Sequence, residues 1–364
     1  MVAKMPDKHT IMPFGPQHPV LPEPLQIKLV LEDERVIEAV PGIGYVHRGL
    51  EKLAEKRDYM SSVYIVERVC GICSIMHAQS YCQGLEALLN VEVTDRAKFL
   101  RVIWAEIHRI HSHLLALGLM ADAFGFESLF MQSWRLREKI LDILEQTTGH
   151  RIMVSINTVG GTRRDLSPEH QKYILSELTE IRTEFAKIDK VFKSDITVAH
   201  RLRGIGVLDK SKAYQLGCVG PVARASGIGQ DMRKLGYAAY GMLDFEPVVM
   251  TDGDSYARTM VRVNEIYQSM DLVTQAIGKL PAGEVLVKVT GNPLGDVVER
   301  LEQPRGEVYY FLRGDGSKNL SRLRLRTPTF AHLASLVEML PGATLPDVPV
   351  IILSIDPCIS CTER

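Results

Sequence analysis

The chain has 364 residues, of which 46% are hydrophobic and 24% charged, and its formal net charge is −1. This composition is typical of a globular protein with ample apolar material for a core, and the nearly neutral charge gives no indication of nucleic-acid binding. No run of eighteen apolar residues occurs, and the start lacks the apolar segment of a signal peptide, so we expect a cytoplasmic location.

The elements are predicted to form one domain with three regions. Residues 1–55 combine a proline-rich loop with two stretches, 25–33 and 34–40, that alternate apolar and polar residues and should pair as strands. Residues 56–278 are mainly helical, because apolar residues recur at three- and four-residue intervals. The expected helices cover much of 59–150, about 167–192 and 256–277, and the expected N-caps are Thr94 or Asp95, and Ser167.

Residues 204–229 are rich in Gly, Pro and Ser, which indicates loops and short helices. The third region, 279–364, is predicted to contain both strands and helices. Strands are expected at 284–289, 306–314, 322–327 and 348–355, with a helix at about 328–339. No internal repeat or linker is evident.

Four of the six cysteines form two Cys-x-x-Cys pairs near opposite ends of the chain. "RVCGIC" contains Cys70 and Cys73, and "DPCISC" contains Cys358 and Cys361. Such a turn brings two thiolates to the same side, so two pairs can complete a four-sulfur site. In a reducing cytoplasm, paired cysteines favour metal or redox roles over structural disulfides.

Three kinds of site fit this spacing. Structural zinc is the commonest use of paired cysteines, although compact zinc modules hold their pairs about 15–20 residues apart. Thioredoxin-like redox chemistry is disfavoured because neither pair lies in a βαβ pattern. A soft transition metal is the third alternative. Spacing alone therefore favours zinc.

The surrounding residues change that order. "RVCGIC" with His77 four positions further on, "DPCISC", "GPQHP" at 15–19, "GCVGPVARASGIGQDMR" at 217–233 and "PRG" at 304–306 together resemble the large, catalytic subunit of nickel–iron hydrogenases. "GPQHP" and 217–233 are similar to the energy-converting, membrane-associated branch (group 4), of the Ech or CO-induced type. That branch is related to the 49-kDa subunit of respiratory complex I. The resemblance implies an α+β fold, with a long central helical bundle flanked by small β-sheets.

The resemblance also implies a Ni–Fe centre. Cys70 and Cys358 would be terminal nickel ligands, and Cys73 and Cys361 would bridge nickel to an iron that carries carbon monoxide and cyanide. The complex I relative lacks these cysteines. Their presence therefore favours a hydrogenase over a quinone-binding subunit.

Two further residues match family positions near the open side of that centre. Glu23 in "LPEPL" matches the proton-gate glutamate, which would receive protons after the Cys358 thiolate; the alternative is an exposed loop glutamate. Arg305 matches the arginine over the open metal face, where a guanidinium can polarise bound hydrogen. Its alternative is a turn arginine in a surface ion pair.

His77 is expected to donate a hydrogen bond to the Cys73 sulfur, with an ordinary helix histidine as the alternative. Asp356 would either orient Arg305 or cap the turn before the second pair, and we weigh these equally.

Glu51 matches the family's carboxylate ligand to a second ion, Mg²⁺ or Fe²⁺. Most relatives supply a C-terminal histidine to that ion, whereas this chain ends in Arg364, so a Glu51–Arg364 ion pair is the alternative. Most relatives also lose a C-terminal extension after nickel insertion. We therefore expect either a mature form or a gene without that extension.

Two remaining motifs have simpler interpretations. "HRIHSH" at 108–113 is interpreted as core or interface histidines, because no carboxylate of the motif completes a metal set. "RLRLR" places three arginines on one face of a strand, which favours a partner-docking edge over nucleic-acid binding: Arg322, Arg324 and Arg326.

Cys82 and Cys218 cannot build a four-thiolate cluster, so electrons must leave through another polypeptide. The family partner is an iron–sulfur small subunit.

We predict that the chain is the catalytic subunit of a multi-subunit hydrogenase that interconverts H₂ with two protons and two electrons. This hydrogenase would evolve H₂ from reduced ferredoxin, and membrane subunits would couple the reaction to ion translocation. It would attach peripherally to the cytoplasmic side of the membrane. The alternatives are a metal-free, complex I-like quinone-site or assembly subunit, and a zinc-stabilised structural protein.

Overall fold

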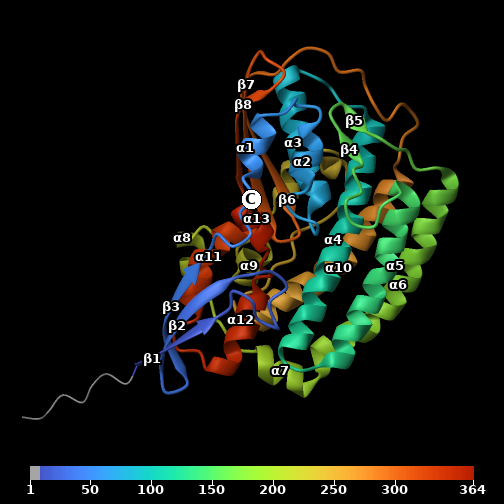
Figure 1. The fold of residues 1–364 in the computed structure, drawn as a ribbon. Helices are drawn as coiled ribbons and strands as arrows, with labels where there is room; N and C mark the ends of the chain where they lie inside the picture. The colour runs from blue at the N-terminus through green and yellow to red at the C-terminus, as the bar shows by residue number, and fades with distance from the viewer. Residues whose placement is uncertain (1–8) are drawn as a thin grey trace, which may run out of the picture.

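The computed structural model describes residues 9–364, so the first eight residues of the predicted N-terminal region lie outside the described part. Small antiparallel sheets lie beside a group of long, roughly parallel and antiparallel helices (Figure 1). This arrangement is the predicted α+β fold, and the family comparisons below also support it.

The N-terminal sheet has the order β1-β2-β3, formed by His9–Phe14, Gln26–Glu32 and Arg35–Gly42. The predicted pairing of the second and third strands is confirmed. Alternate residues Ile27, Leu29 and Leu31 are buried because successive side chains of a strand point to opposite faces. They pack in one hydrophobic cluster with residues of helices α11 (Pro328–Met339) and α12 (Val348–Ser354).

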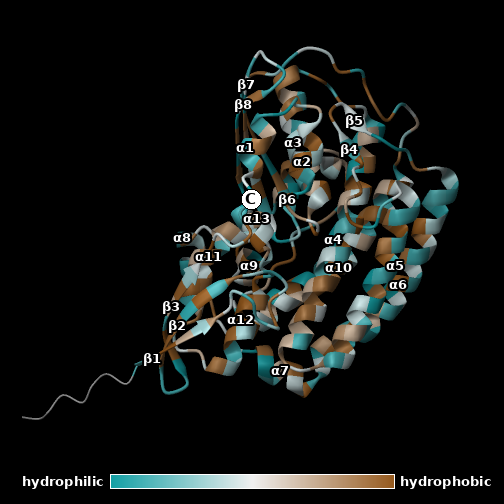
Figure 2. Cartoon of the chain, viewed as in Figure 1, coloured by the Kyte–Doolittle hydropathy of each residue, from teal (hydrophilic) through white to brown (hydrophobic). Residues whose placement is uncertain are grey.

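Four long helices form the centre: α4 (Asp95–Ala123), α5 (Glu127–Thr148), α6 (Pro168–Ser194) and α10 (Ser255–Gly278). The Thr94 and Ser167 side chains cap α4 and α6, as predicted. Helix α4 packs against both α5 and α10 and is buried around most of its circumference. On α6, brown and teal residues alternate as expected for one buried face (Figure 2).

A second sheet has the order β6-β7-β8, formed by Leu294–Gln303, Gly306–Asp315 and Leu320–Arg326. It packs against α1 (Leu50–Glu55) and α3 (Ser74–Leu89), with α2 (Ser62–Glu67) beside them. The remaining elements are short: β4 (Asn157–Thr158), β5 (Gly161–Thr162), α7 (Ile196–Leu202), α8 (Lys210–Gln215), α9 (Gly220–Ala225), η1 (Met232–Leu235), η2 (Tyr240–Met242), η3 (Leu345–Asp347) and α13 (Ile359–Glu363).

Two predicted strands are wrong. Of residues 348–355, all but Ile355 form helix α12, with Pro349 in its first turn, because a short apolar run can be a buried helix as well as a buried strand. Residues 284–289 form no strand and make one isolated bridge, from Leu286 to Gly161. Strand β7 pairs on one side with β8 and on the other with β6. The sequence did not predict β6 because its charged and partly exposed residues carry a weak strand signal.

Among residues 9–364, no helix is both long enough and apolar enough to cross a membrane.

One close backbone approach positions the β6–β7 turn. Gly306 has a φ of +131°, and a Cβ there would lie 2.8 Å from the backbone nitrogen of Gly220. We expect Gly306→Ala to lower the free energy of unfolding by about 2–4 kcal/mol, because it adds backbone strain to a collision between main chains. Gly316, with a φ of +86° and no atom closer than 4.0 Å to such a Cβ, is the matched control. Gly316→Ala should cost about 1 kcal/mol in denaturant unfolding; equal losses would contradict this role of the close approach.

Candidate metal centre

The two Cys-x-x-Cys pairs meet at one buried point. Cys73 immediately precedes α3, Cys358 immediately precedes α13, and Cys361 lies within α13. The Sγ atoms of Cys70 and Cys358 are 3.1 Å apart, and those of Cys73 and Cys361 are 3.3 Å apart. All four side chains are buried. Segments from opposite ends of the chain therefore present four sulfur atoms to one another.

The electrostatics of the four thiols fit a bound metal. Hydrogen bonds from the neighbouring Cys358, Cys361 and Cys73 thiols lower the pKa of Cys70 well below its usual range, whereas burial raises the pKa of Cys361. Four buried thiols cannot all ionise unless a cation compensates their charge. The ligand atoms of Cys70, Cys358 and Cys361 lie within 4.8 Å of one another. This donor set suits a soft or borderline metal held by thiolates.

His77 lies beside Cys73 and Cys361, and its hydrogen-bond partner differs from the predicted one. Its Nε2 atom is 3.3 Å from the Sγ of Cys361, so the hydrogen bond predicted toward Cys73 is instead made with Cys361. The reason is geometric: His77 follows Cys73 by one turn of α3, and its ring extends across to α13. The Tyr310 hydroxyl, 2.7 Å from Nδ1, fixes the ring from the other side.

Arg305 and Asp356 form a buried pair next to the cysteines. Arg305 lies in the two-residue turn between β6 and β7, and its Nη2 donates to Oδ1 of Asp356 at 2.7 Å. Its Nε also donates to the Asp356 carbonyl at 2.8 Å, and its side chain is 2% exposed. Arg305 is thus a turn arginine, but it is not part of a surface ion pair. Burial opposes its charge, yet the Asp356 carboxylate and the thiols of Cys358 and Cys70 raise its pKa.

The contacts of Asp356 match the first of its two alternatives, because Oδ1 accepts from the Arg305 guanidinium and Oδ2 has no partner in the described part of the chain. The side chain therefore caps no backbone N–H group, although Asp356 stands in the turn before Cys358 with a φ of 52°. A left-handed conformation is tolerated by aspartate better than by most residues.

Glu23 lies against the start of α13 rather than in solvent. Its carboxylate accepts hydrogen bonds from the backbone N–H groups of Ile359 and Ser360 and from the Ser360 hydroxyl. These partners directly follow Cys358. The carboxylate is thereby held close to the backbone of the second cysteine pair.

A small cavity adjoins this site. Its volume is about 20 Å³, and its lining includes Glu23, Ile72, Arg305, Asp356, Leu115 and Leu353. A space of this size holds about one water-sized molecule, whereas a cavity that admits a benzene ring is about 150 Å³.

Glu51 makes ion pairs with two arginines. Its Oε1 accepts from Nε of Arg364 at 3.0 Å, and its Oε2 accepts from Nη1 of Arg324 at 3.0 Å. Oε1 also accepts from the backbone nitrogen of Leu325 at 2.9 Å. With both oxygens engaged by cations, the geometry corresponds to the ion-pair alternative rather than to the ligand shell of a second metal.

The two remaining motifs have intramolecular partners. His108 lies 3.4 Å from the Ser74 hydroxyl, His111 accepts from Arg137 at 2.8 Å, and His113 contacts Glu265 at 2.9 Å. All three rings are buried. The strand arginines pair with glutamates of the same chain: Arg322 with Glu55, Arg324 with Glu51, and Arg326 with Glu307.

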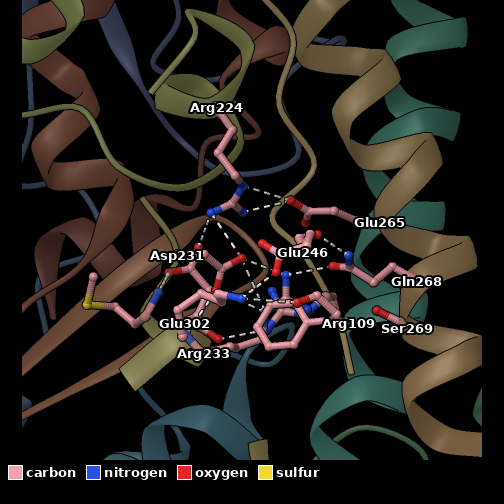
Figure 3. A network of polar contacts seen from close by, with 12 residues as sticks. Arg109, Arg224, Asp231, Arg233, Glu246, Glu265, Gln268, Ser269 and Glu302 are labelled. Carbon is pink, nitrogen blue, oxygen red and sulfur yellow. Dashed lines mark hydrogen bonds and ion pairs between the residues drawn. The ribbon is translucent and has the colours of Figure 1, made fainter. Parts of the chain in front are cut away.

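Sequence reasoning missed a network of buried charges, most of whose members are labelled in Figure 3. We call it the charge network and define it as Glu106, Arg109, His113, Arg224, Asp231, Arg233, Glu265 and Glu302. Its signal was present in the sequence. Glu106, Arg109 and His113 interrupt the apolar residues of a helix at spacings of three and four, and three more members lie in the 217–233 motif.

Comparisons with known proteins agree with this geometry. Residues 123–292 and 286–364 match the model of the respiratory-chain NADH dehydrogenase 49-kDa subunit, and residues 48–118 match that of nickel-dependent hydrogenase. The chain is 38% identical to the alpha subunit of a membrane-bound hydrogenase from Pyrococcus furiosus, over 97% of this chain and 87% of that subunit. It is also 38% identical to the carbon monoxide-induced hydrogenase of Rhodospirillum rubrum, over 97% and 99%, and 33% identical to a subunit of the NADH-quinone oxidoreductase of Clostridium beijerinckii, over 96% of each.

The fold and the two family matches place the chain in the class that unites hydrogenase large subunits with the 49-kDa subunit of respiratory NADH dehydrogenase. Within that class, the chain belongs to the family of group 4, membrane-associated nickel–iron hydrogenase large subunits.

The paired thiols should determine the metal content of the protein. We expect Cys70→Ser to lose most of the bound metal, because the hydroxyl is a much poorer ligand for soft metals than a thiolate. Cys82→Ser is the matched control, since Cys82 is equally buried but lies further along α3, and burial raises its pKa. Elemental analysis of the purified protein complexes provides the measurement. Equal metal content in wild type and Cys70→Ser would argue against the site.

Proposed function

We propose that this chain is the catalytic subunit of a multi-subunit hydrogenase that interconverts H₂ with two protons and two electrons at a thiolate-bound Ni–Fe centre. In the cell it would evolve H₂ from reduced ferredoxin in a reaction coupled to ion translocation. The observation that carries this proposal is the meeting of the two cysteine pairs, with Sγ atoms 3.1 and 3.3 Å apart.

The residues around the thiols have distinct roles in this proposal. When bound, the Ni–Fe centre, with carbon monoxide and cyanide on iron, would supply the heterolytic cleavage and formation of H₂. The thiolates of Cys70, Cys73, Cys358 and Cys361 would hold this centre. His77, held by Tyr310, would fix the sulfur of Cys361 through its Nε2 atom.

Arg305 would present a permanent positive charge to the open side of the centre. Its guanidinium is held by two hydrogen bonds to Asp356, at 2.8 and 2.7 Å, and the pair is shielded from solvent. Such a preorganised charge stabilises developing negative charge without reorganisation. Because Asp356 raises the pKa of Arg305, this residue is suited to orient and polarise rather than to act as the base.

The Cys358 thiolate would accept the proton first, and Glu23 would pass it on. Glu23 lines the cavity next to Arg305 and receives hydrogen bonds from Ile359 and Ser360, the residues after Cys358. A carboxylate anchored by hydrogen bonds to backbone N–H groups and a hydroxyl can exchange protons with a neighbouring thiol after a small rotation.

The partners in this proposal are an iron–sulfur small subunit, a ferredoxin-type donor that acts through it, and membrane subunits. The P. furiosus relative is named as a subunit of a membrane-bound hydrogenase. We infer a peripheral position on the cytoplasmic side of the membrane. The alternative, a quinone-site subunit, is supported by the relatives named as subunits of NADH-quinone oxidoreductase. The four thiols favour the hydrogenase.

Replacing a proposed terminal ligand tests the activity directly. We expect Cys358→Ser to abolish hydrogen–deuterium exchange with solvent, because both a nickel ligand and the first proton acceptor are lost. Cys218→Ser, at another buried thiol, should retain exchange close to the wild-type rate. Exchange is measured by mass spectrometry of HD formed from D₂ in water; wild-type exchange in Cys358→Ser would refute the proposal.

The proposed proton route is tested at Glu23. Glu23→Gln removes the titratable group but keeps a similar shape, so we expect H₂ evolution to fall at least about 100-fold while the metal content is unchanged. Ser360→Ala removes one hydrogen-bond donor to the carboxylate but leaves the carboxylate itself, and should keep most of the activity. If Glu23→Gln evolves H₂ at the wild-type rate, protons leave by another route.

A further inference from the structure

Tyr310 is a buried residue beside the metal centre, and its side chain faces His77. It lies in β7, the central strand of the second sheet, and is paired with Glu299 of β6 and with Leu325 of β8. Helix α3, which carries His77, packs against this sheet. Because β7 has a neighbouring strand on each side, backbone hydrogen bonds fix the position from which the Tyr310 side chain extends.

The imidazole of His77 lies between a hydroxyl and a sulfur. The Tyr310 oxygen is 2.7 Å from Nδ1, and the two ring centroids are 5.9 Å apart with an interplanar angle of 60°. On the other side of the ring, Nε2 is 3.3 Å from the Sγ atom of Cys361. Both rings are fully buried, so within residues 9–364 the two ring nitrogens have these partners and no others.

The hydrogen atoms available to these groups decide which nitrogen of His77 is protonated. A neutral imidazole carries one N–H group, at Nδ1 or at Nε2, and the other nitrogen is an acceptor. The Tyr310 phenol keeps its hydrogen at neutral pH, and burial raises its pKa further. Among the described residues, Nδ1 of His77 is the one acceptor within reach of that hydroxyl. Nδ1 can accept only when it carries no hydrogen itself.

The two tautomers differ in the hydrogen bonds that they leave unmade. With the hydrogen on Nε2, Tyr310 donates to Nδ1 and Nε2 donates to the Cys361 thiolate, so both contacts are hydrogen bonds. With the hydrogen on Nδ1, the Tyr310 hydroxyl becomes an acceptor and its own hydrogen is buried without a partner. In that case a lone pair of Nε2 also faces the thiolate, which has no hydrogen to donate. Unpaired buried donors are costly, so the Nε2–H tautomer is favoured.

The tautomer also decides whether His77 can be a metal ligand. The ligand atoms of Cys73, His77 and Cys361 lie within 4.8 Å of one another, so distance alone would allow His77 to bind a metal together with the two sulfurs. A ring nitrogen binds a metal through its lone pair, and a protonated Nε2 has none. The hydrogen bond from Tyr310 thus makes His77 a donor to the sulfur instead of a ligand.

We propose that Tyr310 is a positioning residue that sets the tautomer of His77, so that Nε2 donates a hydrogen bond to the Cys361 thiolate and stays out of the ligand shell of the metal. Hydrogen bonds to sulfur ligands withdraw electron density from the metal and are among the features that set its reduction potential. This effect on catalysis rests on the proposed hydrogenase function. The tautomer itself follows from the contacts of Tyr310 and Cys361 and does not depend on the reaction.

The tautomer is measured by solid-state ¹⁵N NMR of the assembled complex labelled at histidine, because protonated and unprotonated ring nitrogens have well-separated chemical shifts. The His77 signals are those missing from His77→Gln, a replacement of similar size that keeps an N–H donor. We expect wild type to show a protonated Nε2 and an unprotonated Nδ1. In Tyr310→Phe, which removes the donor to Nδ1, we expect a second set of His77 signals with Nδ1 protonated. A protonated Nδ1 in wild type would overturn the proposal.

A second measurement is infrared spectroscopy of the carbon monoxide and cyanide bands. A weaker hydrogen bond to the Cys361 sulfur leaves more electron density on the metal centre, so these bands should shift to lower wavenumber in Tyr310→Phe while the metal content stays unchanged. Tyr309→Phe is the matched control, because it removes the same hydroxyl from the neighbouring residue of β7, whose side chain extends to the opposite face of the sheet. Its infrared bands and His77 signals should equal those of wild type.

The outcomes for Tyr310 and for the proposed function are distinguishable. The wild-type NMR spectrum tests the tautomer without requiring Tyr310→Phe to fold. Unchanged His77 signals and unchanged infrared bands in a folded Tyr310→Phe would overturn the role of Tyr310 and leave the hydrogenase function standing. A complex with the expected NMR signals but without carbon monoxide and cyanide bands would contradict the proposed function and leave the role of Tyr310 intact.

Discussion

The contact between the two cysteine pairs constrains most of the surrounding structure. Sulfur atoms from the start of α3 and from α13 approach to 3.1–3.3 Å without solvent access. Helix α13 has only five residues and is far too short to be stable alone. It is held by Glu23 at its start and by Glu363, whose carboxylate accepts from the backbone N–H groups of Gly44 and Val46. The centre therefore depends on the N-terminal segments that bind the end of the chain.

Charge burial is the second constraint. The Arg305–Asp356 pair and the charge network are removed from water within a single helical and sheet framework, and such groups are tolerated only when each has ionic or hydrogen-bonding partners. These contacts connect α4, α9, α10 and the β6–β7 turn. The framework that positions Arg305 is therefore the same one that holds the charge network.

The long helices and the cysteine motifs could be predicted because their signals are local. Thr94 and Ser167 cap helices with clear apolar periodicity, and the spacing within each cysteine pair indicates candidate metal ligands without knowledge of the fold. Residues 348–355 could not be assigned by pattern, since an apolar run of that length suits both a strand and a buried helix. The preference of His77 for Cys361 and the pairing of Arg224 with Glu265 and Glu302 arise from contacts between distant segments. No local pattern contains that information.

Strand β8 is the outer strand of the second sheet, and side chains of α1 cover its free edge. Glu51 and Glu55 of α1 accept the backbone N–H groups of Leu325 and Leu323, alternate residues of β8. Carboxylates thus occupy the hydrogen-bonding positions that another strand would use, and the flanking arginines neutralise them. This edge is closed to sheet extension, which protects it against self-association through main-chain pairing. Any neighbouring polypeptide on this side of the molecule must be recognised through side chains.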